Sequence, residues 1–243
     1  MSHRPPTKGI PAHFKSIVAV LALSLLAGCQ TAAPVVSATA VEEGEAGPAA
    51  VPGEASRYEV LPAQSEVRVL VYRAGALAKF GHNHVVTGPV EGNLYRAGEL
   101  PMSGFRLRIP VDDFDVDTPS ARAEEGEDFP GTLSDQARSG TKTNMLSETQ
   151  LAATEHPDIE IESIALSGPR WNPDVRARVQ VRDVVRAVRF PAAVFEEGDH
   201  LVVIANFTVN LTDFGIEPFS AFGGGLQVRD SLVIRVRVTA QRR

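Results

Sequence analysis

The chain has 243 residues, of which 43% are hydrophobic, and its 30 acidic and 24 basic residues give a net charge of −6. This composition is typical of a globular protein, and the acidic balance argues against a nucleic-acid partner, which requires a basic face to displace counterions. Cys29 is the only cysteine, so an intramolecular disulfide is excluded and the folded domain has no thiol for catalysis.

The first 29 residues are interpreted as a lipoprotein signal peptide. A positively charged start is followed by an apolar run over residues 17–26, which is too short to span a bilayer as a helix. Leu26-Ala27-Gly28-Cys29 then resembles a bacterial lipobox, in which Cys29 is acylated and becomes the mature N-terminus. With Gln30 after the cysteine, this predicts a lipid anchor in the outer membrane of a bacterial cell envelope, facing the periplasm. An ordinary signal peptide that ends near a cysteine is the alternative.

Residues 30–55 are predicted to be a disordered tether. They consist largely of Ala, Pro, Gly, Val and Glu and include no aromatic residue, so they cannot bury enough apolar surface to offset the entropy of ordering. Residues 56–243 then form a single domain. Without the three basic residues of the leader and the four glutamates of the tether, its net charge is −5.

Alternation of apolar and polar residues dominates the domain. Val67, Val69 and Val71 share one face of a predicted strand, because successive side chains of a strand point to opposite faces. The same alternation marks residues 105–111, 175–181, 201–211 and 232–238, and further strands are predicted over 85–95, 159–166 and 184–195. About eight such strands, joined by Gly, Pro and Asp turns, predict an all-β fold, an antiparallel barrel or sandwich.

Residues 132–156 lack this alternation. Ser147 with Gln150 three residues later matches a helix capping box, and Pro157 ends the segment. We therefore expect one or two short helices over the mouth of the barrel. Three apolar side chains are expected to face inward from them: Met145, Leu146 and Leu151.

Four segments, taken in order, carry a family resemblance. They are Tyr58-Glu59-Val60-Leu61-Pro62-Ala63-Gln64-Ser65, Val116-Asp117-Thr118, Met145-Leu146 with the later stretch 155–163, and Asp213-Phe214-Gly215-Ile216. Together they resemble the YceI-like family, lipocalin-like barrels that bind polyisoprenoids and related lipids, over residues 58–239. The chain departs from the family at residues 179–185, where a strand that usually contains two glycines has none.

The resemblance implies a hollow, antiparallel barrel of about eight strands that binds an amphipathic isoprenoid-like lipid or a quinone without catalysis. The residues expected to contact the ligand are Val69, Val71, Phe80, His82, His84, Phe105, Leu107, Ile109, Met145, Leu146, Phe207 and Phe214. Three more phenylalanines are candidates for the same lining: Phe114, Phe219 and Phe222. From the residues alone, a barrel filled by its own side chains, acting as a structural interaction module, is an open alternative.

The stretch Gly81-His82-Asn83-His84 is the strongest candidate for chemistry. If the strand already runs there, His82 and His84 point to the same face, and imidazoles at this spacing can converge on one metal ion. A metal site needs a third or fourth ligand, and none stands at a diagnostic spacing. Two interpretations remain open at this point: a polar gate that binds a lipid head group, and a metal- or haem-dependent redox centre.

The sequence contains no recognisable catalytic motif. Asp113, Asp115 and Asp117, followed by Glu124, nearly match a calcium-binding loop, but Thr118 stands where the sharp turn of that loop needs glycine. A solvated strand end is therefore predicted there, with no metal site. No Gly-x-Ser-x-Gly motif is present, so serine hydrolysis has no support.

Overall fold

The computed structural model describes residues 36–37, 39–41 and 55–243. The predicted signal peptide, including Cys29, and most of the predicted tether lie outside these residues. No helix in the described ranges has the length and apolar character needed to cross a membrane.

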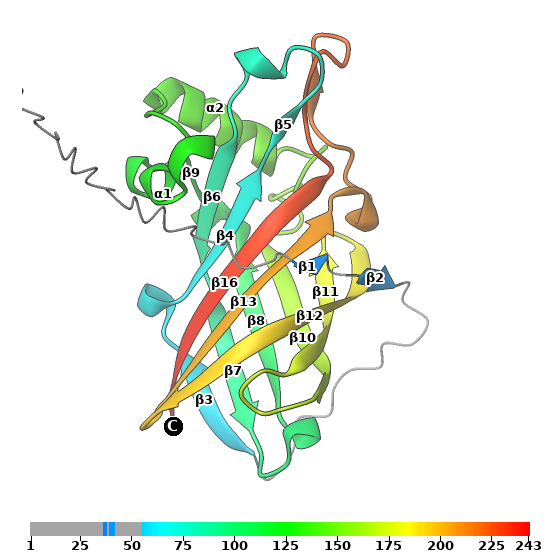
Figure 1. The fold of residues 1–243 in the computed structure, drawn as a ribbon. Coiled ribbons are helices and arrows are strands. Elements are labelled where there is room, and N and C mark those ends of the chain that lie inside the picture. The colour runs from blue at the N-terminus through cyan, green and yellow to red at the C-terminus, as the bar shows by residue number, and fades with distance from the viewer. Residues whose placement is uncertain (1–35, 38, 42–54) are drawn as a thin grey trace, which may run out of the picture. The chain divides into compact units, whose positions relative to one another are not determined.

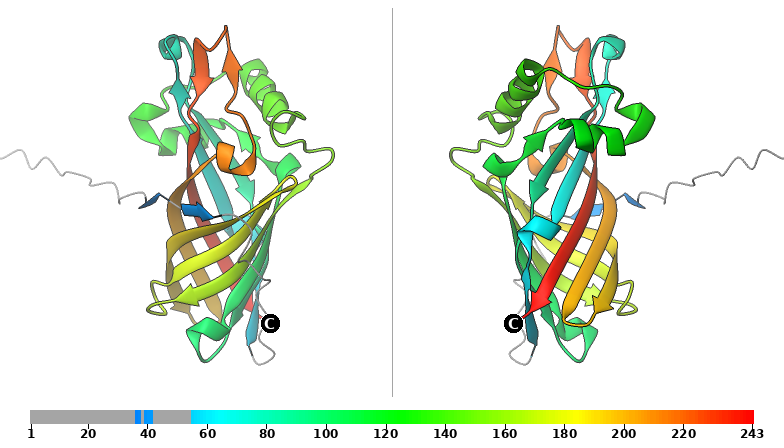
Figure 2. Two further views of the ribbon diagram at one scale, coloured as in Figure 1. Left: turned by 90° about the vertical axis from the view of Figure 1, so that its right-hand side faces the viewer. Right: turned by 90° about the vertical axis from the view of Figure 1, so that its left-hand side faces the viewer.

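The described domain is a closed antiparallel barrel with eight strand positions (Figures 1 and 2). In chain order the positions are β3 (Ser56–Val60) with β4 (Glu66–Val71), β6 (His84–Pro89) with β7 (Glu91–Arg96), β8 (Gly104–Pro110) with β9 (Asp115–Val116), β10 (Asp158–Ser167), β11 (Asp174–Val181), β12 (Val184–Glu197), β13 (His200–Asn210) and β16 (Ser231–Arg242). Each position pairs with the next along the chain, and β16 closes the barrel against β13, β3 and β4. The prediction of an antiparallel barrel of about eight strands is confirmed.

The first three strand positions are each interrupted beside a proline. The breaks are the 3-10 turn η2 (Pro62–Gln64), Val90 after Pro89, and the 3-10 turn η5 (Val111–Asp113) after Pro110. Proline cannot donate a ladder hydrogen bond, so pairing stops at these points. The two halves of each strand still follow the same neighbour, because β3 pairs with β7 while β4 pairs with β6.

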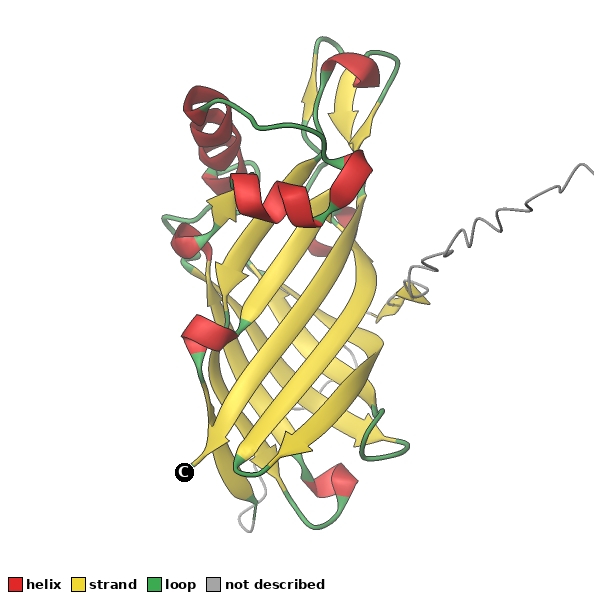
Figure 3. Ribbon diagram, turned by 60° about the vertical axis from the view of Figure 1, so that its left-hand side comes forward, coloured by secondary structure: helices red, strands yellow, loops and turns green. Residues whose placement is uncertain are grey.

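The two ends of the barrel differ. Two helices, α1 (Pro119–Glu124) and α2 (Asp135–Leu146), lie at one end, here called the mouth end (Figure 3). A small second sheet of β5 (Arg73–Ala74), β15 (Leu226–Val228) and β14 (Ser220–Ala221) lies at the same end, with the 3-10 turns η3 (Ala78–Phe80), η6 (Gly126–Asp128) and η7 (Thr212–Phe214). The opposite end, here called the base, carries η4 (Leu100–Met102), the short β10–β11 and β12–β13 connections, and the C-terminus. Short helices at the mouth end are confirmed, but only α2 lies in the predicted segment 132–156, and α1 precedes it.

The predicted start of a helix at Ser147 is wrong. The helix α2 begins after Ser134, whose Oγ accepts a hydrogen bond from Ala137 N (3.2 Å), and it ends at Leu146. Ser147 is the C-cap, and its Oγ donates to the Asn144 carbonyl (2.7 Å). The capping-box pattern is short, and serine also satisfies carbonyl groups at the end of a helix, so the motif alone did not tell the two ends apart.

One apolar residue on the outer face of the barrel explains how the helical segment is attached. Leu70 points away from the interior and is buried together with Val85, Ala121 and Phe129, so the α1–η6 segment covers this part of the wall. Salt bridges add to the contact, because Glu125 on this segment binds Arg68 (2.9 Å) on β4 and a second arginine on β16.

Part of the predicted tether also contacts the barrel. The short strands β1 (Val36–Ser37) and β2 (Thr39–Val41) pair with β13 and β12, respectively. They pair with the parts of β13 and β12 that lie beyond the stretch where these two strands pair with each other, and they leave the ring of eight positions unchanged.

Substitution of Gly92 tests how closely β7 and β8 approach each other. Its φ is +124°, and a Cβ atom there would lie 2.2 Å from the Arg106 carbonyl oxygen. We expect Gly92→Ala to lower the free energy of unfolding by about 2 kcal/mol or more, because it adds backbone strain and a steric clash. Chemical denaturation of the variant and the wild type measures this.

The matched control is Gly140 in α2, where a Cβ atom meets nothing within 4 Å. Gly140→Ala should raise the free energy of unfolding by about 0.5–1 kcal/mol, since alanine favours a helix interior over glycine. Equal effects of the two substitutions would contradict the close approach at Gly92.

Candidate ligand-binding site

The barrel encloses a cavity of about 380 Å³. All eight strand positions contribute lining side chains, which are almost all Val, Leu, Ile, Ala and Phe, and α2 contributes lining side chains at the mouth end. Phe190 and Phe207 stack in the wall with their ring centroids 4.2 Å apart. The volume lies in the range of roughly 300–1,000 Å³ that is usual for small-molecule sites. The barrel is therefore hollow, with room for an apolar ligand.

The polar lining is confined to the mouth end. Five lining residues carry polar side chains: His84 at the start of β6, Asn210 at the end of β13, Thr141 and Asn144 in α2, and Gln150 after it. Among the described residues that line the cavity there is no Asp, Glu, Lys or Arg. Towards the base the interior is packed, with Tyr58, Val60, Leu201 and Ala240 buried in the core below the cavity. The cavity therefore has an apolar body and one polar end.

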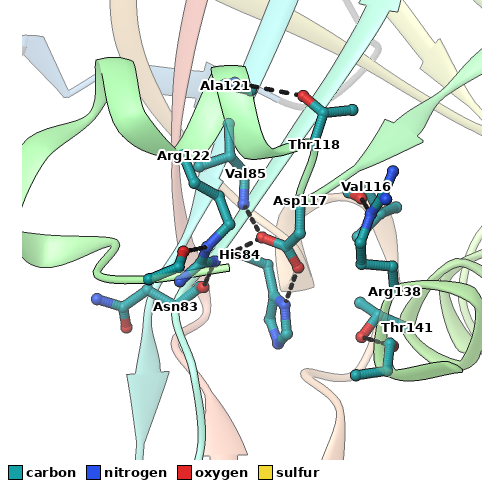
Figure 4. A network of polar contacts seen from close by, with 12 residues as sticks. Asn83, His84, Val85, Val116, Asp117, Thr118, Ala121, Arg122, Arg138 and Thr141 are labelled. Atoms are coloured by element: carbon teal, nitrogen blue, oxygen red, sulfur yellow. Dashed lines mark hydrogen bonds and ion pairs between the residues drawn. The ribbon is translucent and has the colours of Figure 1, made fainter. Parts of the chain in front are cut away.

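His84 is held in place by a buried carboxylate (Figure 4). Its Nδ1 lies 2.6 Å from Asp117 Oδ2, and the Asp117 side chain is completely buried. A carboxylate only accepts hydrogen bonds, so Nδ1 must donate, which leaves Nε2 as the ring nitrogen available to a ligand. Nε2 accepts a hydrogen bond when the ring is neutral and donates one when the ring is protonated.

The charge of Asp117 is balanced by Arg122, which is 1% exposed. Arg122 Nη1 donates to Asp117 Oδ1 (2.7 Å) and to the Asn83 carbonyl (2.8 Å), while Val85 N donates to the same carboxylate oxygen (3.0 Å). The other two nitrogens of the same guanidinium, Nε and Nη2, donate to the carbonyls of Gly131 and Pro130, respectively. The network joins the start of β6 to the α1–η6 segment. The ring of His84 is therefore held by a residue outside its own strand.

These contacts also set the ionisation of Asp117. Burial by itself would raise the pKa of this carboxyl, but the hydrogen bonds from His84, from Val85 N and from Arg122 outweigh it and hold the pKa below its ordinary value. Asp117 is therefore a carboxylate at neutral pH. Its backbone has a φ of +53°, a conformation that a non-glycine residue adopts only when its surroundings compensate the strain.

The structure places most of the predicted contact residues around the cavity. Nine of them line it: Val69, Val71, His84, Phe105, Leu107, Ile109, Met145, Phe207 and Phe214. Leu146 packs against the core beside the cavity without lining it. That these residues bind a ligand stays a prediction.

Phe80 and His82 lie elsewhere. Phe80 is 69% exposed on η3, and the side chain of His82 is also exposed, so neither lines the cavity. Among the other predicted phenylalanines, Phe114 and Phe219 line the cavity, whereas Phe222 is 80% exposed. Alternation predicted positions inside strands well, but it carried no information about side chains on the connections.

The histidines do not form the pair that their spacing predicts. Strand β6 begins at His84, so His82 precedes the strand and the two side chains do not share a strand face. Although the side chain of His82 is exposed, partial desolvation of its ring, the neighbouring His84 and the nearby Arg122 and Arg73 lower its pKa. Within the described ranges, no three His, Cys, Asp or Glu side chains come together as a set that would hold a metal ion.

Sequence reasoning missed the partners of His84. Asp117 was predicted to be at a solvated strand end, yet it is buried and bound to a residue 33 positions earlier. No sequence pattern singles out Arg122, yet its side chain is buried. A helix start at Thr118-Pro119 is visible in the sequence, because Thr118 caps α1 and proline is favoured at the first helical position, and this signal would have placed Asp117 at a helix entrance.

The Asp117 network makes a pH-dependent prediction. Its folded-state pKa lies below the ordinary value of 3.8, so its contribution to stability is present above that pH and is lost as pH falls through the folded-state pKa. Asp117→Asn should lower the free energy of unfolding at neutral pH by about 3–5 kcal/mol, because it leaves a buried arginine without its counter-charge. Denaturation curves at neutral and acidic pH measure both effects.

Asp174 provides the control. Its pKa is also lowered, by a hydrogen bond from Arg189, but this pair lies on the surface, where ion pairs contribute little. Asp174→Asn should change the neutral-pH stability by less than about 1 kcal/mol. A loss for Asp117→Asn no larger than this would show that the buried network does not hold the mouth.

Comparisons with known proteins agree with this architecture. The model of the YceI-like domain matches residues 58–240. None of the curated proteins matches the chain. The crystal structure of Burkholderia cenocepacia BcnA is similar with a TM-score of 0.52 and 12% identity, over 75% of this chain and 99% of that chain, which shows a common fold. A Campylobacter jejuni YCEI protein has a TM-score of 0.46 and 8% identity, over 63% and 81% of the two chains. Because the domain model matches most of the chain, the protein belongs to the family of YceI-like domains.

Proposed function

We propose that this protein binds an amphipathic isoprenoid-like lipid inside its barrel. The observation that carries the proposal is the enclosed cavity, whose lining is apolar along its length and polar only at the mouth end. Such a cavity matches a ligand with a hydrocarbon chain and one polar head. Each buried CH₂ group contributes about 0.8 kcal/mol to binding, so the apolar body supplies most of the affinity.

The lining favours an uncharged head group. The five polar residues at the mouth end offer hydroxyl, amide and imidazole groups, and within the described lining there is no Lys or Arg to neutralise a phosphate. The buried Arg122 already donates to Asp117 and to three backbone carbonyls. A hydroxyl or carbonyl head, as in an isoprenol or a quinone, therefore fits better than a phosphorylated one.

The proposal includes a cellular setting that rests on the sequence. The lipobox-like Leu26-Ala27-Gly28-Cys29 favours a lipid anchor in a bacterial outer membrane, facing the periplasm, with the membrane as the partner. A protein held beside a bilayer would exchange an apolar ligand with it. The alternative of a filled barrel is disfavoured by the cavity, and no observation favours a redox centre at His82 and His84.

Neighbouring residues of β13 allow a sharp test of the cavity. Ala205 lines the cavity, whereas the next residue back, Ile204, is exposed on the outside of the same strand. We expect Ala205→Trp to reduce the lipid that co-purifies with the protein several-fold, because the indole occupies the space of the ligand. Organic extraction followed by mass spectrometry of the extract measures this.

The control for Ala205→Trp is Ile204→Trp, which should retain the lipid. The lipid content is compared at equal amounts of folded protein, since Ala205→Trp also overpacks the core and lowers stability. Wild-type protein that carries no lipid and takes up no isoprenoid quinone would contradict the proposed function.

His84 should recognise the head group. We expect His84→Phe to weaken binding of an isoprenol by roughly two- to tenfold, which corresponds to one lost hydrogen bond of about 0.5–1.5 kcal/mol. Binding of an isoprenoid hydrocarbon of equal length, without the hydroxyl, should be unchanged. Comparing the two ligands on one variant separates head-group recognition from any loss of stability.

His82→Phe is the matched control for His84→Phe. The side chain of His82 is exposed and does not line the cavity, so its removal should leave both affinities unchanged. If the two histidine variants behave alike, His84 does not select the head group.

A further inference from the structure

Two segments far apart in the sequence form a projection at the mouth end. They are residues 73–81, with β5 and η3, and residues 219–228, with β14 and β15, and together they are called the finger here. Figures 1 and 2 show the finger extending past the helices at the mouth end. Val228 pairs with Arg73 and Gln227 pairs with Ala74, so the two segments are parts of one small sheet.

The finger is tightly built. Leu77 N donates to the Gly225 carbonyl (2.7 Å), and a Cβ atom on Gly75 would lie 2.5 Å from the same oxygen. A Cβ atom on Gly81 would lie 2.6 Å from the Leu226 side chain. Glycines at these contacts let the two segments approach closely, so the finger presents its side chains from a defined position.

The finger displays apolar side chains to solvent. Of the seven large hydrophobic residues that are exposed in the described chain, four lie here: Leu77, Phe80, Phe219 and Phe222. Phe222 sits in the tight β14–β15 turn with a φ of +53°, so this turn directs an aromatic ring into water at a strained backbone position. Exposed apolar side chains that gather in one place mark a surface that another apolar phase covers.

The charge of the finger differs from that of the domain. Residues 73–81 and 219–228 include Arg73 and Lys79 and no acidic residue, although the domain as a whole has a net charge of −5. Lys79 Nζ lies 5.0 Å from the centre of the Phe80 ring, so a cation stands beside an exposed aromatic side chain. This combination suits a bilayer surface, where aromatic rings enter the interface and basic side chains reach the phosphates.

The finger is also continuous with the cavity. Phe219 and Val228 line the cavity, and Phe219 is at the same time part of the exposed apolar set. A protein partner of ordinary size would cover about 800 Å² and 20–30 residues on each side, which is far more than four side chains on a narrow projection offer. A bilayer requires only a few inserted side chains.

We propose that the finger is a membrane-docking surface that inserts Phe80 and Phe222 into a phospholipid bilayer at the mouth of the cavity. The inference extends the proposed function, because docking would place the cavity opening against the phase from which an apolar ligand comes. Docking itself needs no ligand in the cavity.

The sole tryptophan of the chain makes this testable. Trp171 lies on the β10–β11 connection at the base and is 70% exposed, so it reports on the end opposite the finger. Phe222→Trp combined with Trp171→Phe moves the single reporter to the finger. Both full-length proteins are mixed with vesicles of phosphatidylcholine that carries brominated acyl chains, which quench only fluorophores that enter the bilayer.

The introduced tryptophan at position 222 should be quenched several-fold and the native Trp171 should not. Because both proteins share one N-terminal segment, attachment through that segment alone cannot produce the difference. Equal quenching of the two reporters, or no quenching of the one on the finger, would overturn the proposal. The proposal would also be overturned if, without vesicles, the emission of the reporter at position 222 changed with protein concentration as dimers form. The finger would then bind a second copy of the chain.

A second pair of variants tests the inserted side chains. In the protein with the reporter on the finger, Phe80→Ser should reduce the quenching of that reporter by brominated lipid several-fold, because one aromatic side chain fewer leaves water and the finger inserts less. Phe195, which is exposed on β12 near the base, is the control, and Phe195→Ser should have no effect. These experiments use vesicles without the cavity ligand, so they test docking separately from lipid binding. Docking can be absent while lipid still co-purifies with the protein, and docking can occur when no lipid co-purifies.

Discussion

The structure depends on the closure of the barrel by its last strand. Strand β16 pairs along the full length of β13 on one side and with β3 and β4 on the other, so the end of the chain meets its beginning. Closure removes the free strand edges that would otherwise recruit another chain. It also turns the apolar inner faces of all eight strand positions towards one space, whose width at eight strands accommodates either packed side chains or a small ligand.

What distinguishes this interior is its division along the barrel axis. The base is packed with buried side chains such as Tyr58 and Leu201, whereas the space towards the mouth end is open and ends in polar groups. This gradient arises from the chain connections. The base has short connections between strands, while three of the four connections at the mouth end are long and bring α1, α2 and the finger to this end.

The mouth is organised around one buried carboxylate. Burying a charge is unfavourable unless it is paired and hydrogen-bonded, and Asp117 meets this condition through His84, Val85 N and Arg122. The same contacts offset its positive φ and keep His84 in one orientation. Next to this fixed polar group stands the finger, with its exposed aromatic rings. The two features divide the proposed tasks, since His84 faces the interior and the finger faces outwards.

The sequence by itself determined an all-β fold of about eight strands, and the family resemblance favoured a barrel over a sandwich. Period-two alternation in segments such as 67–71 and 201–211 is a local property that follows from strand geometry, so it predicted the strands, their inward faces and six of the nine predicted contact residues that line the cavity. The resemblance to YceI-like proteins added that the interior would be hollow. Neither source located the helix ends, because serine serves both as an N-cap and as a C-cap.

Only the tertiary structure decided what surrounds the cavity mouth. The contact of His84 with Asp117, the burial of Arg122 and the exposure of Phe80 and Phe222 all depend on which connections meet after the barrel closes. These residues lie on the connections or at the start of a strand, and the contact that holds His84 joins residues 33 positions apart. Local pattern therefore predicts the walls, whereas long-range packing of the connections creates the polar end of the cavity and the finger beside it.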